Sequence, residues 1–87
     1  MELLIEIPDY SQEAGLRFEW EYAFTIHLEV QHGEVILSAN QAGLVSLARH
    51  LLTLAQEHVP VGHHIHLDEF TGLEDASCAF IIQKISP

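Results

Sequence analysis

Histidine and acidic side chains are concentrated in one short stretch of the chain, HHIHLDE, from His63 to Glu69. If this stretch is a strand, His64, His66 and Asp68 project from one side, because successive side chains point to opposite faces. Imidazole and carboxylate groups at this spacing are ligands of the kind that hold Zn²⁺ or another divalent metal. The alternative is an exposed strand face on which Asp68 hydrogen-bonds a neighbouring imidazole, and we favour this second interpretation.

No catalytic constellation accompanies these residues. The single cysteine, Cys78, lies in an apolar stretch of an acidic chain, whereas a catalytic thiol needs an electropositive, partly exposed setting. The sequence contains neither a Gly-x-Ser-x-Gly elbow nor a glycine-rich phosphate-binding loop. We therefore expect a protein that is not an enzyme and has no cofactor, with Zn²⁺ at His64, His66 and Asp68 as the alternative.

Charge is the strongest feature of the composition. Three Lys and Arg residues stand against thirteen Asp and Glu residues, which gives a formal net charge of −10. A nucleic acid would be repelled, because affinity for phosphates comes from cationic side chains, whereas a basic protein would be attracted. Protonation of all seven histidines as the pH falls toward about 6 would move the net charge toward −3 and weaken binding to a basic partner.

The chain shows no sign of a membrane or secretory segment. No apolar run reaches the roughly 18 residues of a membrane-spanning helix, and the stretch from Met1 to Pro8 has no basic amino-terminal region. One cysteine cannot form an internal disulfide and suits a reducing compartment. These features predict cytoplasmic residence.

Period-two alternation, which indicates a half-buried strand, recurs along the chain. The longest run, Arg17 to Gln31, exceeds a typical strand of about 5–6 residues, so a bend near Ala23 is predicted. A turn at His32-Gly33 and a return run over 34–39 predict a hairpin. Further strands are predicted over 1–7, 63–68 and 77–85. The longest run carries an aromatic row that we interpret as core rather than as a platform for stacking bases or sugars: Phe18, Trp20, Tyr22 and Phe24.

Between these strands, Gln41 to His58 predicts one amphipathic helix, capped by Ser38 or Asn40. Its apolar arc, predicted to face the core, comprises Leu44, Leu47, Ala48, Leu51, Leu54 and Ala55, with Leu52 at the edge. The opposite, polar arc includes Ser46, Arg49, His50 and Thr53. Residues 1–87 are therefore predicted to form one α+β domain, an antiparallel sheet of about five strands in the order β-β-β-α-β-β with the helix packed on one face.

One helix covers only one face of a sheet, so the other face would stay exposed. That face would carry an acidic patch suited to a basic protein partner or to a second copy of the chain. Together with the histidine-rich strand it supplies the predicted binding residues, which are Glu19, Glu21, His27, Glu29, His64, His66, Asp68 and Glu69. The high apolar fraction of a short chain, 48%, also favours a buried subunit interface, so a homodimer is a further hypothesis.

One set of positions carries a family resemblance. The motif Asn-x-x-Gly-Leu at the start of the helix is followed by Gly-x-His-x-His after it, at Asn40, Gly43, Leu44, Gly62, His64 and His66. This pattern resembles the small bacterial immunity protein 32 family, over Ser38 to Ile85. The resemblance implies a cytoplasmic antidote that binds and neutralises a toxin domain of a polymorphic toxin system. The leading hypothesis is thus a non-enzymatic toxin-binding protein, and the alternative is a small metal-binding protein or metal-dependent enzyme.

Overall fold

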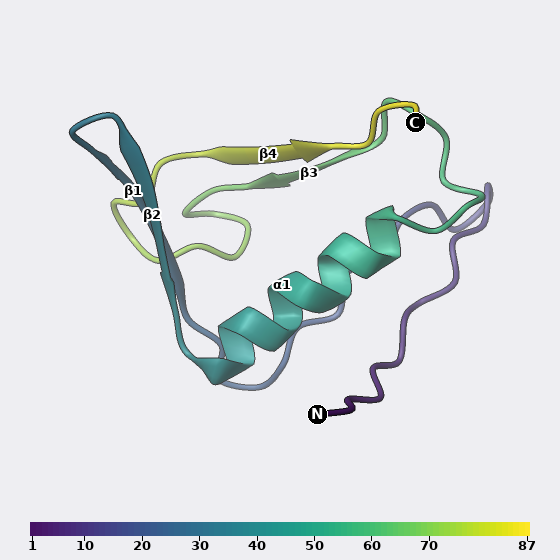
Figure 1. Ribbon diagram of the computed structural model, residues 1–87, viewed down its shortest axis with the longest axis horizontal. Helices are drawn as coiled ribbons and strands as arrows, with labels where there is room; N and C mark the ends of the chain where they lie inside the picture. The colour runs from purple at the N-terminus through teal and green to yellow at the C-terminus, as the bar shows by residue number, and fades with distance from the viewer.

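One helix and two β-hairpins make up the regular structure of the protein, as the computed structural model of residues 1–87 shows (Figure 1). In chain order the elements are β1 (Ile26–Gln31), β2 (Glu34–Ala39), α1 (Gln41–Leu54), β3 (His64–Leu67) and β4 (Phe80–Gln83). β1 pairs with β2 and β3 pairs with β4, both antiparallel, in two separate sheets. The predicted α+β class is confirmed, whereas the predicted single sheet of about five strands is wrong. None of the helical structure combines the length and the apolar character that a membrane-spanning helix needs.

Of the two strands predicted near the amino terminus, one is absent and the other is shorter than predicted. Met1–Ile7 forms no strand, and the run that begins at Arg17 becomes a strand only from Ile26 onward. The bend predicted near Ala23 is present as a turn in which this residue has a φ of 61°, in the left-handed region. The turn separates an irregular segment from β1, so the alternating pattern before it does not correspond to a strand.

The β1–β2 hairpin confirms the prediction for this part of the chain. His32 and Gly33 have φ values of 51° and 79°, and a two-residue type I′ turn requires positive φ at both central positions. The antiparallel register closes directly on these two residues. Ile26 and Leu28 are buried on the inner face of β1. The hairpin is therefore specified locally, by its turn and by its alternation.

Of the two predicted helix caps, Ser38 and Asn40, the residue that caps α1 is Asn40, because Ser38 belongs to β2. The side-chain Oδ1 of Asn40 accepts a hydrogen bond of 2.8 Å from the amide of Gly43, which satisfies one of the free donors of the first turn. The helix ends at Leu54, earlier than the predicted end at His58. Helix α1 is thus shorter than its sequence pattern indicates.

The predicted orientation of α1 is wrong over most of its length. Ser46, His50 and Thr53 from the polar arc are fully buried, each with 0% of its surface exposed. Of the apolar arc, Leu47 and Leu54 are buried. The other leucines point to solvent, with exposed fractions of 55% for Leu44, 48% for Leu51 and 50% for Leu52.

The polar side of α1 faces inward because it binds the irregular segment 8–25. Backbone groups of a segment outside any sheet need other partners, and polar helix side chains supply them. Ser46 Oγ accepts a 2.8 Å hydrogen bond from the amide of Glu21, and Asn40 Oδ1 accepts one of 3.0 Å from the amide of Thr25. With this side of the helix occupied, the leucines on the opposite side are left at the surface.

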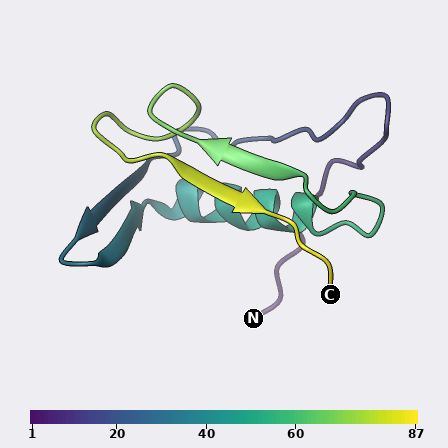
Figure 2. The same cartoon turned by 90° about the horizontal axis from the view of Figure 1, so that it is seen from above.

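The β3–β4 hairpin lies over α1, and part of the core is between them (Figure 2). The strand predicted over 77–85 is present as β4 but covers only Phe80–Gln83, and its predicted central position is wrong, because Ile81 is 58% exposed on its outer side. The aromatic row packs against the core as predicted except for Tyr22, which is 96% exposed. The buried core comprises Ile26, Leu28, Leu47, Leu54, Val59, Ile65, Leu67 and Leu73.

Candidate protein-binding surface

Strand β3 places two histidines on its outer face. Ile65 and Leu67 are buried, whereas His64 and His66 are exposed, so the alternation predicted for this strand is confirmed. Across the hairpin His66 lies opposite Ile81. The outer face of β3 and β4 is therefore a mixed surface of imidazole and apolar side chains.

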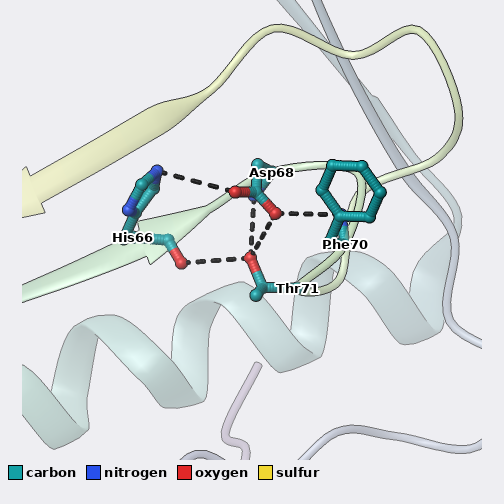
Figure 3. Close-up of polar contacts among 4 residues, drawn as sticks. All are labelled: His66, Asp68, Phe70 and Thr71. Atoms are coloured by element: carbon teal, nitrogen blue, oxygen red, sulfur yellow. Dashed lines mark hydrogen bonds and ion pairs between the residues drawn. The ribbon is translucent and has the colours of Figure 1, made fainter.

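Asp68 follows β3 and closes a hydrogen-bonded turn (Figure 3). Its Oδ1 accepts hydrogen bonds of 2.9 Å from the amide of Phe70 and from the hydroxyl of Thr71. The Thr71 hydroxyl in turn accepts a hydrogen bond from the Asp68 amide. The Thr71 hydroxyl is the largest cause of a pKa of Asp68 below its usual value, and the Phe70 amide and the neighbouring His66 add to it. The charged carboxylate therefore stabilises the turn through these two hydrogen bonds.

The metal alternative receives no support from this geometry. No group of three His, Cys, Asp or Glu side chains lies close enough together to hold a metal ion. His66 Nε2 and Asp68 Oδ2 are 3.7 Å apart, which is an ion pair only when the imidazole is protonated. His64 projects from the same face without joining them in a cluster.

The acidic loop, Asp68–Asp75, is bound to the edge of β1. The amide of Glu74 donates a 2.8 Å hydrogen bond to the carbonyl of Ile26, and the amide of Cys78 donates one of 3.0 Å to Leu28. This arrangement brings the loop beside the first hairpin (Figure 1). Through Glu74, the acidic loop that begins at Asp68 therefore contacts the strand that carries His27 and Glu29, which are half-buried.

Three residues of the acidic loop were missed when the sequence was considered alone. Glu74 and Asp75 are both exposed and add two carboxylates to the loop. The acidic run EFTGLEDA, residues 69–76, is the sequence feature that could have indicated them. Phe70 is 86% exposed, and its amide is held by Asp68. An aromatic side chain this exposed has no role in the core. No periodic pattern marks Phe70 in the sequence, since it lies in a loop.

Two of the predicted binding residues belong to a different segment from this loop. Glu21 forms an ion pair of 2.7 Å with Arg49 of α1, and Glu19 is exposed in the irregular segment before β1. Because that segment is not a continuation of β1, the expected single acidic face does not form. The segment does approach the acidic loop, where the ring of Trp20 lies against Gly72.

These features describe a small acidic α+β protein with an exposed loop that carries four carboxylates and one phenylalanine and is held by a hydrogen-bonded turn at Asp68. The chain belongs to the immunity protein 32 family, since the model of that family matches residues 34–85. The match begins at β2 and includes α1, β3, the acidic loop and β4. No curated protein and no solved structure matches the chain. Membership of an immunity protein family implies a cognate toxin protein as binding partner, and such families are generally non-enzymatic.

The positions that carried the family resemblance include two with structural roles. Asn40 caps α1, accepts a hydrogen bond from the amide of Thr25 and donates one of 2.9 Å to the carbonyl of Ala23. At Gly43, a Cβ atom would collide with the carbonyl oxygen of Thr25. These residues join the helix to the chain before β1.

Proposed function

We propose that this protein is a cytoplasmic, non-enzymatic immunity protein that neutralises a bacterial toxin domain by direct contact through the acidic loop. The observation that carries the proposal is the family match over residues 34–85, which contains this loop and both histidines of β3. His64, His66, Asp68 and Glu69 lie inside the matched span. Glu19, Glu21, His27 and Glu29 lie outside it, and we assign them to contacts particular to this member of the family.

The chemistry of the acidic loop favours a basic toxin surface. Its carboxylates are Asp68, Glu69, Glu74 and Asp75, and the loop contains no Lys or Arg. The whole chain, loop included, has a net charge of −10. Charge of this sign raises the association rate with a cationic protein by about 10-fold to 1000-fold at low salt. A basic nuclease-type domain, whose own substrate is anionic, is a partner of this chemistry.

Phe70 supplies the apolar contact that such an interface needs. Most of the binding energy of a protein interface comes from a few residues, often aromatic, that fill a pocket of the partner. The Asp68 carboxylate fixes the Phe70 amide, so part of the ordering of this loop is complete before binding. An exposed aromatic residue in a loop with four carboxylates therefore combines an anchor with electrostatic steering.

The test uses a toxin domain from a gene directly upstream of the gene of this protein, which the proposal expects to be present. Co-expression should restore growth of cells that carry the toxin, and calorimetry with the purified pair should detect a complex. The double variant Glu74→Lys/Asp75→Lys should weaken binding by at least about tenfold, because two loop carboxylates become cations. Glu69 is left unchanged, since its Oε2 accepts a hydrogen bond from the amide of Ala76.

The matched control is Glu13→Lys/Glu57→Lys, which alters the net charge by the same amount at exposed positions outside the loop. It should slow association without a comparable loss of affinity. Equal losses in the two double variants would contradict a binding site at the acidic loop. Absence of both complex and growth rescue would contradict the immunity function itself.

A further inference from the structure

The outward side of α1 is an apolar surface in a strongly charged protein. This outer helix face consists of Leu44, Val45, Ala48, Leu51, Leu52 and Ala55, which fall on one side of the helix at 3.6 residues per turn. Leu44, Leu51 and Leu52 are each about half exposed or more. Soluble monomers rarely display a continuous apolar stripe of this kind, which marks an interaction surface.

The accessible surface of the chain is larger than expected for a folded monomer of its mass. A folded monomer of 9.8 kDa has an accessible surface of about 5,200 Å². The present chain exposes 6294 Å², about 1,100 Å² more than that expectation. Part of the excess belongs to the extended residues 1–7, and the outer helix face contributes another part. A standard interface buries about 800 Å² on each partner, so the excess of the whole chain is of the same order as one interface.

The distribution of charge points to a second copy as the occupant. Two molecules with a net charge of −10 repel each other over most of their surfaces. The stretch from Val35 to Gln56 contains no Asp or Glu, and its one charged side chain, Arg49, is paired with Glu21. The outer helix face is therefore where two copies meet with the least repulsion. A cationic partner, by contrast, gains nothing from contact with this acid-free stretch.

The order of side chains on this face is also self-complementary. A twofold interface brings the same patch of both subunits together, so each position must suit its symmetry partner. In an antiparallel helix pair centred on Ala48, Leu44 lies opposite Leu52 and Val45 lies opposite Leu51. Ala48 faces its own copy, and a methyl group at the crossing point permits the close approach of packed helices. Tyr22, next to Val45 in a shallow depression, extends the apolar surface at one end.

We infer that the protein forms a homodimer in which the α1 helices of two copies pack antiparallel through the outer helix face, centred on Ala48. This inference is independent of the toxin-binding function, because the acidic loop does not belong to the face. The dimer would present two acidic loops to solution. It also gives the exposed leucines of α1 the burial that the single chain does not provide.

Mass measurement by light scattering on the purified full chain tests the inference. The unaltered protein should have twice the 9.8 kDa mass of the chain at micromolar concentrations. Leu51→Glu should reduce the mass to that of one chain, because it places two buried charges in the interface. The control Leu4→Glu introduces the same charge at a residue that is 99% exposed and lies outside the helix, and it should leave the dimer intact. An unaltered protein of single-chain mass up to about 200 μM would overturn the inference.

A cross-linking variant decides the geometry without depending on the stability of Leu51→Glu. Ala48→Cys in a Cys78→Ser background should give a disulfide-linked dimer under mild oxidation, since the two Ala48 positions face each other. The control Gln31→Cys in the same background places its thiol on the exposed end of β1 and should stay monomeric on denaturing gels. Equal cross-linking of the two variants would refute the antiparallel helix pair. Toxin affinity of Leu51→Glu, measured in parallel, should equal that of the unaltered chain, and a loss of binding there would mean that the toxin occupies this face.

Discussion

The ring of Trp20 lies edge-on to the imidazole of His50, with the ring centroids 4.3 Å apart and an interplanar angle of 80°. Phe18 approaches the same imidazole edge-on at 5.1 Å. His50 is completely buried, and neither ring nitrogen has a hydrogen-bond partner. Burial in this aromatic surrounding, together with the charge of Arg49, lowers the pKa of His50 from 6.5 to about 4.

Stability should therefore fall in mildly acidic solution. The folded protein resists protonation of His50, whereas the unfolded chain takes up the proton near pH 6.5. The contribution of neutral, buried His50 to the unfolding free energy is fully present above pH 6.5. As the pH falls from 6.5 to about 4, the unfolding free energy should decrease by about 3 kcal/mol. Urea denaturation at a series of pH values should show this decline. His50→Leu should flatten it over that interval, and the exposed control His64→Gln should keep it. An unchanged slope in His50→Leu would exclude His50 as its source.

Asn40 should contribute more to stability than an ordinary helix cap. Asn40→Ala removes the cap, typically about 1 kcal/mol, and also the two hydrogen bonds to Ala23 and Thr25, so a loss of about 2–3 kcal/mol is expected. Asn40→Asp keeps the accepting oxygen but not the donor to Ala23, so its loss should be intermediate. Thermal unfolding of both variants measures the difference. A loss of 1 kcal/mol or less in Asn40→Ala would show that the segment before β1 does not depend on this residue.

Gly43→Ala should destabilise the protein even though alanine is favoured over glycine in helices by about 1 kcal/mol. The added methyl group would meet the carbonyl oxygen of Thr25 and come within 3.1 Å of the Ala39 side chain. A net loss of about 1–3 kcal/mol is expected, as for other overpacked positions. Chemical denaturation provides the measurement, and Gln41→Ala at the exposed start of α1 is the control. A more stable Gly43→Ala variant would mean that α1 and Thr25 are not in close contact.

Phe70→Ala should weaken toxin binding without affecting the fold. The side chain is 86% exposed, so its removal leaves no cavity and should leave the melting temperature unchanged. The loss of an anchor residue corresponds to about 2 kcal/mol, or roughly a thirtyfold weaker complex. Calorimetric titration of the toxin domain provides the measurement. Phe70→Trp, which retains an aromatic ring, should recover most of the affinity. Full affinity in Phe70→Ala would remove this residue from the interface.

Toxin binding should also weaken as the pH falls from 7.5 to 5.5. Histidine protonation reduces the negative charge, but His50 is held neutral until about pH 4. Protonation of the other six histidines would move the net charge from −10 to −4, whereas protonation of all seven would move it to −3. Affinity measured across this range at low salt should decline, and high salt should reduce the difference by screening. A pH-independent affinity at low salt would argue against an electrostatic interface.

The sequence alone determined those features that depend on neighbouring residues in the chain. The hairpin follows from His32-Gly33, because both residues adopt the positive φ that a tight turn needs. The outward position of His64 and His66 follows from strict alternation with the buried Ile65 and Leu67. The matching positions Asn40 and Gly43 also led to the family, and the helix cap is local in the same sense.

Only the tertiary structure decided which side of α1 is buried and where the acidic groups gather. A helical wheel separates apolar from polar residues, but it does not include the irregular segment whose backbone binds Ser46 and Asn40. That segment has a strand-like alternation, and its lack of a pairing strand is a property of the whole fold. The contact between Glu74 and Ile26 likewise joins residues far apart in the chain. Long-range contacts of this kind leave no periodic pattern in the sequence. The position of the acidic loop and the exposure of the α1 leucines depend on such contacts, so neither could be predicted from the sequence.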